Sequence, residues 1–249
     1  MITNPETRTN IVDIGEGIYR INTPIALPDG QSFSFNQYLV HDDEPLLFHT
    51  GPRALFPLVH DAVAAVMPVQ RLRYVGLSHF EADECGSMNQ WLERAPHAVP
   101  LAGRIAAMVS VNDMADRQAR AMGDGEVLVL GKHRLRWIDT PHVPHGWDAG
   151  MMFDETTATM FSGDLFTQPG PGTLALTRDD ILGPSEAFRG PMDYFAHAPQ
   201  TQATLAKLSA LRPRTFACMH GSAWQGNGSA LLLQLAEAVL TNERVLALA

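Results

Sequence analysis

The chain has 249 residues, of which 45% are hydrophobic and 18% are charged, so it is long enough to bury a substantial core and has the composition of a globular protein. Its 27 acidic and 18 basic side chains give a formal net charge of −9, and no Lys- or Arg-rich run is present, which argues against nucleic acid and membrane as partners. Cys85 and Cys218 are the only cysteines, which excludes a disulfide scaffold and a thiolate-rich zinc ribbon.

The first ten residues are polar and lack the basic-then-apolar pattern of a signal peptide. No stretch approaches the roughly 18 apolar residues that a bilayer-spanning helix needs. We therefore expect a cytoplasmic protein with a flexible tail over residues 1–10. No repeat, low-complexity tract or linker interrupts the sequence, so residues 1–249 are expected to form a single domain.

Strand-like and helical patterns follow one another along the whole chain. In chain order, the sequence predicts strands at Gly17–Asn22, Ser34–Val40 and Pro45–Phe48, a helix at Ala54–Val66, a strand at Arg73–Leu77, helices at Cys85–Arg94 and around Ala102–Val109, strands at Val127–Leu130, Leu135–Asp139, Ala149–Phe153 and Thr159–Ser162, a helix at Tyr194–Ala210, a strand at Thr215–Met219 and a helix at Ala230–Ala249.

One long stretch, Thr167–Pro191, is rich in Gly and Pro and is predicted to be irregular. It begins three residues after Asp164. Long irregular loops in compact domains are often binding loops, so we expect this one to cover a functional cleft as a partial lid. An ordinary surface excursion is the alternative.

Three side chains that can bind metals follow the predicted strand at Arg73–Leu77. His79, Glu81 and Asp83 stand at alternate positions. Residues two apart share one side of an extended chain, so His79 and Glu81 can close on one ion, while Asp83 can reach a second as the chain turns into a helix.

Three further candidate ligands also stand near strand ends. His145 follows the strand at Leu135–Asp139, Asp164 follows the strand at Thr159–Ser162, and His220 follows the last predicted strand. If these strands lie in adjacent sheets, their ends meet on one face. Six nitrogen and oxygen donors would then share one cleft.

Taken together, these motifs resemble the metal-ligand set of flavodiiron proteins and of stand-alone oxygen-binding diiron proteins, a branch of the metallo-β-lactamase superfamily. The motifs are Leu-Ser-His79-Phe-Glu81-Ala-Asp83, the later His145, Ser-Gly-Asp164 and His220-Gly. Glu81 stands where the hydrolases of the superfamily have a second His, which marks the diiron branch. The resemblance covers roughly residues 18–224 and implies an α/β (α+β) fold, the four-layer αββα sandwich.

The resemblance also implies roles for the six residues and a cofactor of two iron ions. It assigns His79, Glu81 and His145 to one iron, Asp83 and His220 to the other, and Asp164 to the bridge between them. A carboxylate in place of an imidazole makes the donor set harder, which suits iron, although zinc and manganese remain compatible with it.

One position departs from the family pattern, because Glu84 stands where the usual motif has His. Glu84 has three candidate roles: a ligand of the second iron, a hydrogen-bond partner of a metal-bound water, or a cap of the helix that begins near Cys85. We favour the last two. Four aromatic residues adjoin the candidate ligands and are expected either to form an apolar wall for small gases or to pack the loops: Phe80, Trp147, Phe166 and Trp224.

The resemblance therefore predicts a diiron oxidoreductase or binding protein that binds, senses or reduces O2, or NO by analogy. Flavodiiron enzymes carry a fused flavodoxin domain, whereas this chain ends at Ala249, so a separate electron-donor protein is expected. Dinuclear metallo-hydrolase activity is the alternative, and a non-catalytic signalling module is a third reading. Whether the chain forms a homodimer is left open.

Overall fold

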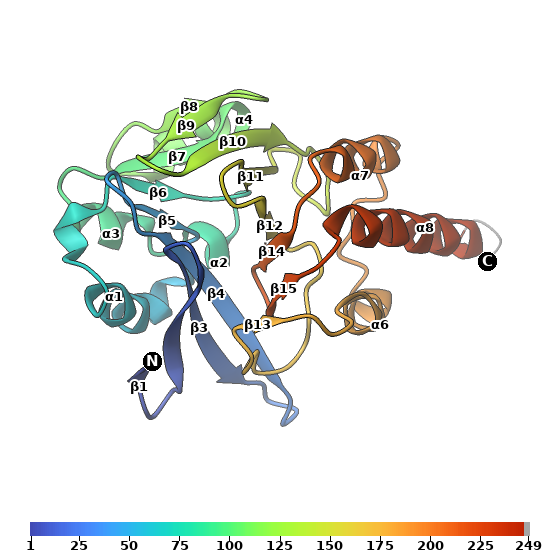
Figure 1. The fold of residues 1–249 in the computed structure, drawn as a ribbon, viewed down its shortest axis with the longest axis horizontal. Coiled ribbons are helices and arrows are strands. Elements are labelled where there is room, and N and C mark those ends of the chain that lie inside the picture. The colour runs from blue at the N-terminus through green and yellow to red at the C-terminus, as the bar shows by residue number, and fades with distance from the viewer. Residues whose placement is uncertain (247–249) are drawn as a thin grey trace.

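The structure is a computed structural model that describes the backbone of residues 1–246 and the side chains of residues 1–241. Two β-sheets pack face to face, and helices cover the outer face of each sheet (Figure 1). This arrangement is the predicted four-layer αββα sandwich. None of the described helices combines the length and the apolar character that crossing a membrane would take.

The first sheet contains the N-terminal half of the chain, and its strands follow sequence order. Its first five strands are antiparallel, and the pairs from β5 to β8 are parallel. The strands are β1 Ile2–Asn4, β2 Thr9–Gly15, β3 Ile18–Ala26, β4 Ser32–Val40, β5 Leu46–Phe48, β6 Tyr74–Gly76, β7 Val99–Gly103 and β8 Arg120–Met122.

Helices fill the connections between the parallel strands of the first sheet, as parallel pairing requires crossover connections. They are the 3-10 helix η1 Arg53–Leu55, α1 Phe56–Ala64, the 3-10 helix η2 Val69–Arg71, α2 Ala82–Cys85, α3 Met88–Arg94, α4 Arg104–Ala106, the π-helix η3 Ala107–Val111 and α5 Asn112–Met114. The predicted helix at Cys85–Arg94 is thus two helices, because the chain bends between Gly86 and Ser87.

The second sheet has the order β13-β15-β14-β12-β11-β10-β9 and is mixed, with β12 parallel to β14 and β13 parallel to β15. Its strands are β9 Val127–Val129, β10 Arg134–Asp139, β11 Gly150–Asp154, β12 Thr159–Gly163, β13 Leu176–Thr177, β14 Thr215–Cys218 and β15 Ala223–Gln225. Its outer face carries α6 Leu182–Met192, α7 Thr201–Ala210 and α8 Gly228–Leu246 (Figure 1).

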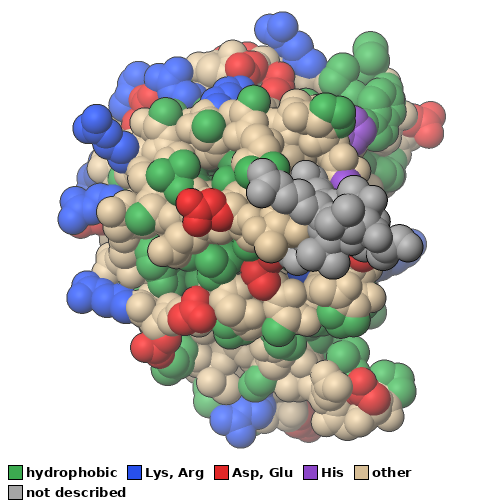
Figure 2. Space-filling model, turned by 90° about the vertical axis from the view of Figure 1, so that its right-hand side faces the viewer, with side chains coloured by type: hydrophobic (Ala, Val, Ile, Leu, Met, Phe, Trp, Pro, Cys, Tyr) green, Lys and Arg blue, Asp and Glu red, His purple; other side chains and the backbone are tan. Residues whose placement is uncertain are grey.

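Three layers of buried apolar side chains hold the sandwich together. Large residues from both sheets, among them Tyr38, Phe48, Trp137 and Phe161, fill the space between the sheets. A second cluster lies between the first sheet and helices α1 and α3, and a third lies under the C-terminal helices. On the face that carries those helices, the visible Lys and Arg side chains lie around the periphery of the view (Figure 2).

The predicted strands all have counterparts, but several predicted segments differ. The helix expected around Ala102–Val109 begins only at Arg104, because Ala102 and Gly103 belong to β7. Residues 1–10, expected to be a tail, contain β1 and the first residues of β2, because Ile2 and Asn4 pair with the neighbouring strand. The helix expected from Tyr194 begins only at Thr201. The stretch Thr167–Pro191, expected to exclude a helix, contains most of α6. Residues 247–249 of the expected C-terminal helix lie outside the described residues.

Candidate metal centre

All six predicted ligands lie at one end of the sandwich, where strands of both sheets stop. His79 follows β6, and Glu81 and Asp83 lie at the start of α2. His145 follows β10, Asp164 follows β12, and His220 follows β14. The first sheet therefore supplies three of the six and the second sheet the other three, so the cleft forms only when the sheets pack together.

Four of the six side chains form one compact group. His79 Nε2 and His145 Nε2 face each other at 3.0 Å. Glu81 Oε1 lies 3.2 Å from His145 Nε2 and 3.6 Å from His79 Nε2. Asp164 Oδ2 lies 3.3 Å and 3.6 Å from the same two nitrogens. Ligand atoms of all four residues lie within 4.8 Å of one another, which suits a single cation.

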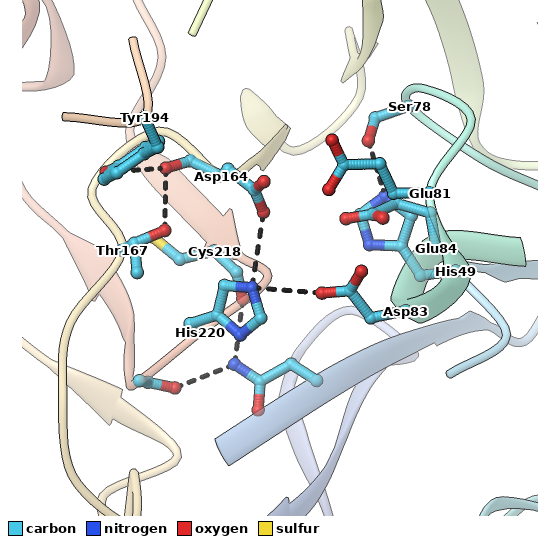
Figure 3. A network of polar contacts seen from close by, with 12 residues as sticks. His49, Ser78, Glu81, Asp83, Glu84, Asp164, Thr167, Tyr194, Cys218 and His220 are labelled. Atoms are coloured by element: carbon cyan, nitrogen blue, oxygen red, sulfur yellow. Dashed lines mark hydrogen bonds and ion pairs between the residues drawn. The ribbon is translucent and has the colours of Figure 1, made fainter. Parts of the chain in front are cut away.

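The other two side chains meet on the opposite side of Asp164. His220 Nε2 lies 3.4 Å from Asp83 Oδ2 and 3.4 Å from Asp164 Oδ1 (Figure 3). Asp164 therefore directs Oδ2 to the first group and Oδ1 to the second. A carboxylate in this position can join two cations.

Hydrogen bonds on the far side of two rings fix which nitrogen faces the cleft. His220 Nδ1 lies 2.9 Å from the carbonyl oxygen of Ser34, which can only accept, so Nδ1 carries the proton and Nε2 offers its lone pair. His79 Nδ1 lies 3.0 Å from Ser78 Oγ, and that hydroxyl lies 2.9 Å from His49 Nε2. Burial, followed by the nearby His79, lowers the pKa of His49 to about 3, so His49 is neutral and can accept from Ser78.

The loop that carries His220 is held by polar side chains from the first sheet. Arg20 donates to the carbonyl oxygens of Gly172 and Gly221 at 2.8 Å and 2.6 Å. Asn36 donates to the carbonyls of Cys218 and Gly221, and the Tyr38 hydroxyl donates to Cys218. None of these three residues belongs to a predicted metal-ligand motif. Arg20 lies at an inward-facing position of β3, and a charged residue among buried neighbours is the signal that could have found it.

The cleft has an anionic field. Burial lowers the pKa of His220, but hydrogen bonds and charge from Asp164 and Asp83 outweigh it and raise that pKa to about 9. Burial likewise opposes the rise of the pKa of His145 to about 10, which Asp164 and Glu81 cause. Hydrogen bonds from His145 and His79 lower the pKa of Glu81 to about 2. A field that favours protonated imidazole also favours a bound metal cation.

Glu84 lies in α2 beside this cleft and is fully buried. Neither carboxylate oxygen has a hydrogen-bond partner among the described residues, and the N-terminus of α2 has no side-chain cap. Desolvation, then the charges of Asp164 and Asp83, raise the pKa of Glu84. No side-chain hydrogen bond caps α2, although Glu84 lies in its first turn, where the helix dipole favours a carboxylate.

A cavity of about 370 Å³ opens onto the candidate ligands. Its apolar wall differs from the predicted one, because Phe80 and Trp147 point largely to solvent while Phe166 and Trp224 pack under the second sheet. The wall is made instead by Leu27, Phe33, Phe188, Met192 and Tyr194. These residues come from the β3–β4 hairpin and from α6 and the loop after it, and local sequence does not bring them together.

Part of the segment predicted as a lid lines the cavity, and the lid itself stays a prediction. Thr167 from its first residues and Phe188 and Met192 from α6 line the cavity. Phe188 stacks on Phe33 with ring centroids 5.6 Å apart, and Phe33 lies 4.4 Å from the ring of His220. Helix α6 therefore forms one side of the cavity and packs on the ring of Phe33.

The residues fit a pair of divalent cations. Four carboxylates and three imidazoles converge without a Lys or Arg among the lining residues of the cavity. Both oxygens of Glu84 are buried without a geometric hydrogen-bond partner among the described residues. Buried carboxylates are paired or coordinate metals in native proteins, so the chemistry of this donor set fits cations.

Comparison with known proteins assigns the family. A family model described as ODP family beta lactamase matches residues 33–221, which include all six predicted ligands. The chain belongs to this family.

Relatives of this ODP-family chain are flavodiiron proteins. The putative diflavin flavoprotein A 5 of Nostoc sp. (strain PCC 7120) is 26% identical over 200 residues, which are 75% of this chain and 33% of that protein. The rubredoxin-oxygen oxidoreductase of Megalodesulfovibrio gigas is 24% identical over 203 residues, which are 78% of this chain and 50% of that protein. The chain therefore spans a third to a half of the length of these two relatives.

Solved structures agree on the fold. The crystal structure of fragment 1–254 of the Nostoc protein gives a TM-score of 0.83 at 18% identity and covers 94% of this chain and 96% of that chain. The flavodiiron protein from Giardia intestinalis gives a TM-score of 0.75 at 17% identity and covers 92% of this chain and 59% of that chain. The fold is therefore the metallo-β-lactamase-like fold of flavodiiron cores.

Proposed function

We propose that this chain is a non-haem diiron protein that binds, senses or reduces O2, with NO as a second candidate gas. The observation that supports this most is the orientation of Asp164, whose two carboxylate oxygens face two separate groups of donors. The first iron would be held by His79, Glu81 and His145, and the second by Asp83 and His220, with Asp164 as the bridge.

Two features of the site support a small uncharged ligand. The cavity is lined largely by apolar side chains, including Leu27, Phe33 and Phe188, which exclude water from one side of the donors. Tyr194 lies against His145 with ring centroids 5.8 Å apart and places its hydroxyl near the backbone of Asp164. Bound iron would supply the redox chemistry, while these residues orient the ligand and shield it.

We propose that electrons come from a separate donor protein. One relative is named rubredoxin-oxygen oxidoreductase, and this name pairs rubredoxin with oxygen in that relative. Because each sheet contributes ligands to the site, we also propose that residues 1–249 work as one domain.

The test begins with anaerobic purification, reconstitution with Fe²⁺ and metal analysis. We expect two irons per chain and consumption of O2 when the reduced protein is mixed with oxygenated buffer, measured with an oxygen electrode. Asp164→Asn should abolish both, because it removes the charge shared between the two positions. Glu237→Gln, an exposed substitution on α8, serves as the control and should change neither.

The opposite result would support the alternative function. A colourless protein that retains two zinc ions in iron-supplemented medium, consumes no O2 and hydrolyses ester or amide substrates would identify a dinuclear metallo-hydrolase. Glu81→His also distinguishes the diiron function from the hydrolase function. The substitution gives the first metal position a third imidazole ligand and should shift the bound metal from iron toward zinc.

A further inference from the structure

The carboxylate of Glu84 lies among the candidate metal ligands, beside the carboxylate of Asp83. Its side chain is fully buried, and neither oxygen has a hydrogen-bond partner among the described residues. Glu84 Oε2 lies 4.0 Å from His79 Nε2. Figure 3 shows Glu84 beside Glu81 and Asp83, across the site from Asp164 and His220.

A purely structural role does not account for this placement. The start of α2 has no side-chain cap, so Glu84 does not satisfy backbone N–H groups there. Its backbone carbonyl accepts from Thr50, which fixes the helix without help from the side chain. An unpaired buried carboxylate destabilises a fold, so in the absence of a cation its presence beside two other carboxylates is unfavourable.

The number of donors in each group indicates which position Glu84 serves. The first group has four donors within 4.8 Å of one another, namely His79, Glu81, His145 and Asp164. The second has Asp83, His220 and the other oxygen of Asp164. The ligand atoms of Glu81, Asp83 and Glu84 also lie within 4.8 Å of one another, so Glu84 lies beside one donor of each position. Because the first position already has four donors and the second has three, Glu84 is assigned to the second.

We propose that Glu84 is a direct ligand of the second metal position, which it completes together with Asp83, Asp164 and His220. This inference rests on the proposed dinuclear site. Glu81, Asp83, Glu84 and Asp164 are four carboxylates, and their combined negative charge equals the positive charge of two divalent cations. With neutral imidazoles, the loaded site is therefore electrically balanced, and no buried charge remains uncompensated.

The two positions consequently differ in donor chemistry. The first has two imidazoles and two carboxylates, and the second has one imidazole and three carboxylates. Oxygen donors favour hard cations such as Mn²⁺, whereas imidazole suits iron and zinc. The second position should therefore select a harder cation than the first when metals compete.

The experiment is calorimetric titration of the metal-free full-length chain with Mn²⁺, for the wild type and Glu84→Gln. We expect two binding events in the wild type. In Glu84→Gln, the first event should be unchanged and the second weakened by at least about 100-fold, the upper range for losing a supporting group around a metal. Glu93→Gln, an exposed substitution on the neighbouring helix α3, is the matched control and should bind as the wild type does.

Thermal unfolding of the metal-free proteins separates ligation from a structural role. Because Gln has nearly the same shape as Glu, metal-free Glu84→Gln should be at least as stable as the wild type, while Mn²⁺ should raise its Tm by less. A variant that is less stable without metal and weakened equally at both positions would identify Glu84 as a structural residue and overturn the proposal.

A crystal structure of the Mn²⁺-loaded wild type gives the direct test. A Glu84 oxygen bonded to the second metal is expected, and a water molecule between the two would overturn the inference. Failure of the wild type to bind a second metal would refute the proposed dinuclear function itself. Two unchanged binding events in Glu84→Gln would refute only the role of Glu84.

Discussion

Ser78 positions the imidazole of His79, a proposed metal ligand, although Ser78 itself does not line the cavity. Its hydroxyl lies between His79 Nδ1 and His49 Nε2, at 3.0 Å and 2.9 Å. If His79 offers Nε2 to a metal, Nδ1 must carry the proton and donate it to Ser78, which in turn donates to the neutral His49. The chain of hydrogen bonds runs in one direction and fixes the ring.

Ser78→Ala should therefore weaken metal binding at the first position. The substitution leaves the buried N–H of His79 without an acceptor and lets the ring turn, and we expect the metal dissociation constant to rise by about 10- to 100-fold. Calorimetry with Fe²⁺ under anaerobic conditions measures it. Ser87→Ala is the matched control, because Ser87 is also buried and its hydroxyl donates to the Thr50 carbonyl. An equal loss of affinity in both variants would contradict the positioning role.

For single residues, the sequence predicts the candidate metal ligands better than the residues that hydrogen-bond to those ligands and their loops. His79, Glu81 and Asp83 are close in the chain, and their spacing alone places them together. Ser78 is adjacent to His79, but its partner His49 lies on another strand, so only the packing of strands reveals the contact. The roles of Arg20 and Asn36 depend on the meeting of two sheets and could not be read from local pattern.

Helix α6 is the element that the sequence analysis missed, and the reason is the position of its prolines. Pro184 is in the first turn, where backbone N–H groups have no partner within the helix, so proline removes nothing there. Pro191 is one residue before the end. Asp180 accepts hydrogen bonds from the backbone N–H groups of Leu182 and Gly183, which supports the start of the helix. A high proline content therefore argues against a helix only when the prolines would fall in its middle turns.

Because Phe188 of α6 stacks on Phe33 above His220, we expect this ring to limit access to the site. Phe188→Ala should leave metal stoichiometry unchanged and speed the removal of iron by a bulky chelator, followed by absorbance. The half-buried ring should contribute only about 1–2 kcal/mol to stability. Leu182→Ala is the control, since Leu182 packs on the core under α6 and not on the cavity. Equal rates of removal in the wild type and Phe188→Ala would show that α6 does not restrict access.

Across the whole molecule, most strands and helices were predicted in the right order, whereas the strands β1, β2, β7, β8, β13 and β15 were not predicted. Strands with several buried apolar residues, such as β4 and β10, give a clear signal, and both of their neighbours in the sheet are strands. The short strands β1, β8, β13 and β15 have two or three residues each and too little pattern to detect. Their pairing comes from the neighbouring strand and not from their own sequence.

The two sheets are also joined at the end of the second sheet, through His133. Its Nδ1 lies 2.8 Å from Asp154 Oδ2 at the end of β11, and its Nε2 lies 3.0 Å from the carbonyl oxygen of Glu16 in the β2–β3 turn. Both partners are acceptors, so only the protonated ring satisfies both contacts. The hydrogen bond with Asp154 raises the pKa of His133 against the effect of burial. Burial alone would raise the pKa of Asp154, but hydrogen bonds from His133 and Thr157 lower it.

This contact should make stability depend on pH in a defined direction. The raised pKa of His133 means that its contribution is complete below the unfolded-state pKa of about 6.5 and is lost as pH rises through the folded-state pKa. The lowered pKa of Asp154 means that its contribution is complete above about pH 4 and is lost as pH falls through the folded-state value. We therefore expect the difference in unfolding free energy between the wild type and His133→Gln to be largest near pH 5.5, on the order of 1–2 kcal/mol, and to shrink toward pH 9. Urea unfolding of the metal-free proteins at several pH values measures this difference, and subtraction of the variant cancels the titration of the metal site. A difference that stays constant from pH 5.5 to pH 9 would mean that the neutral ring joins the two sheets equally well.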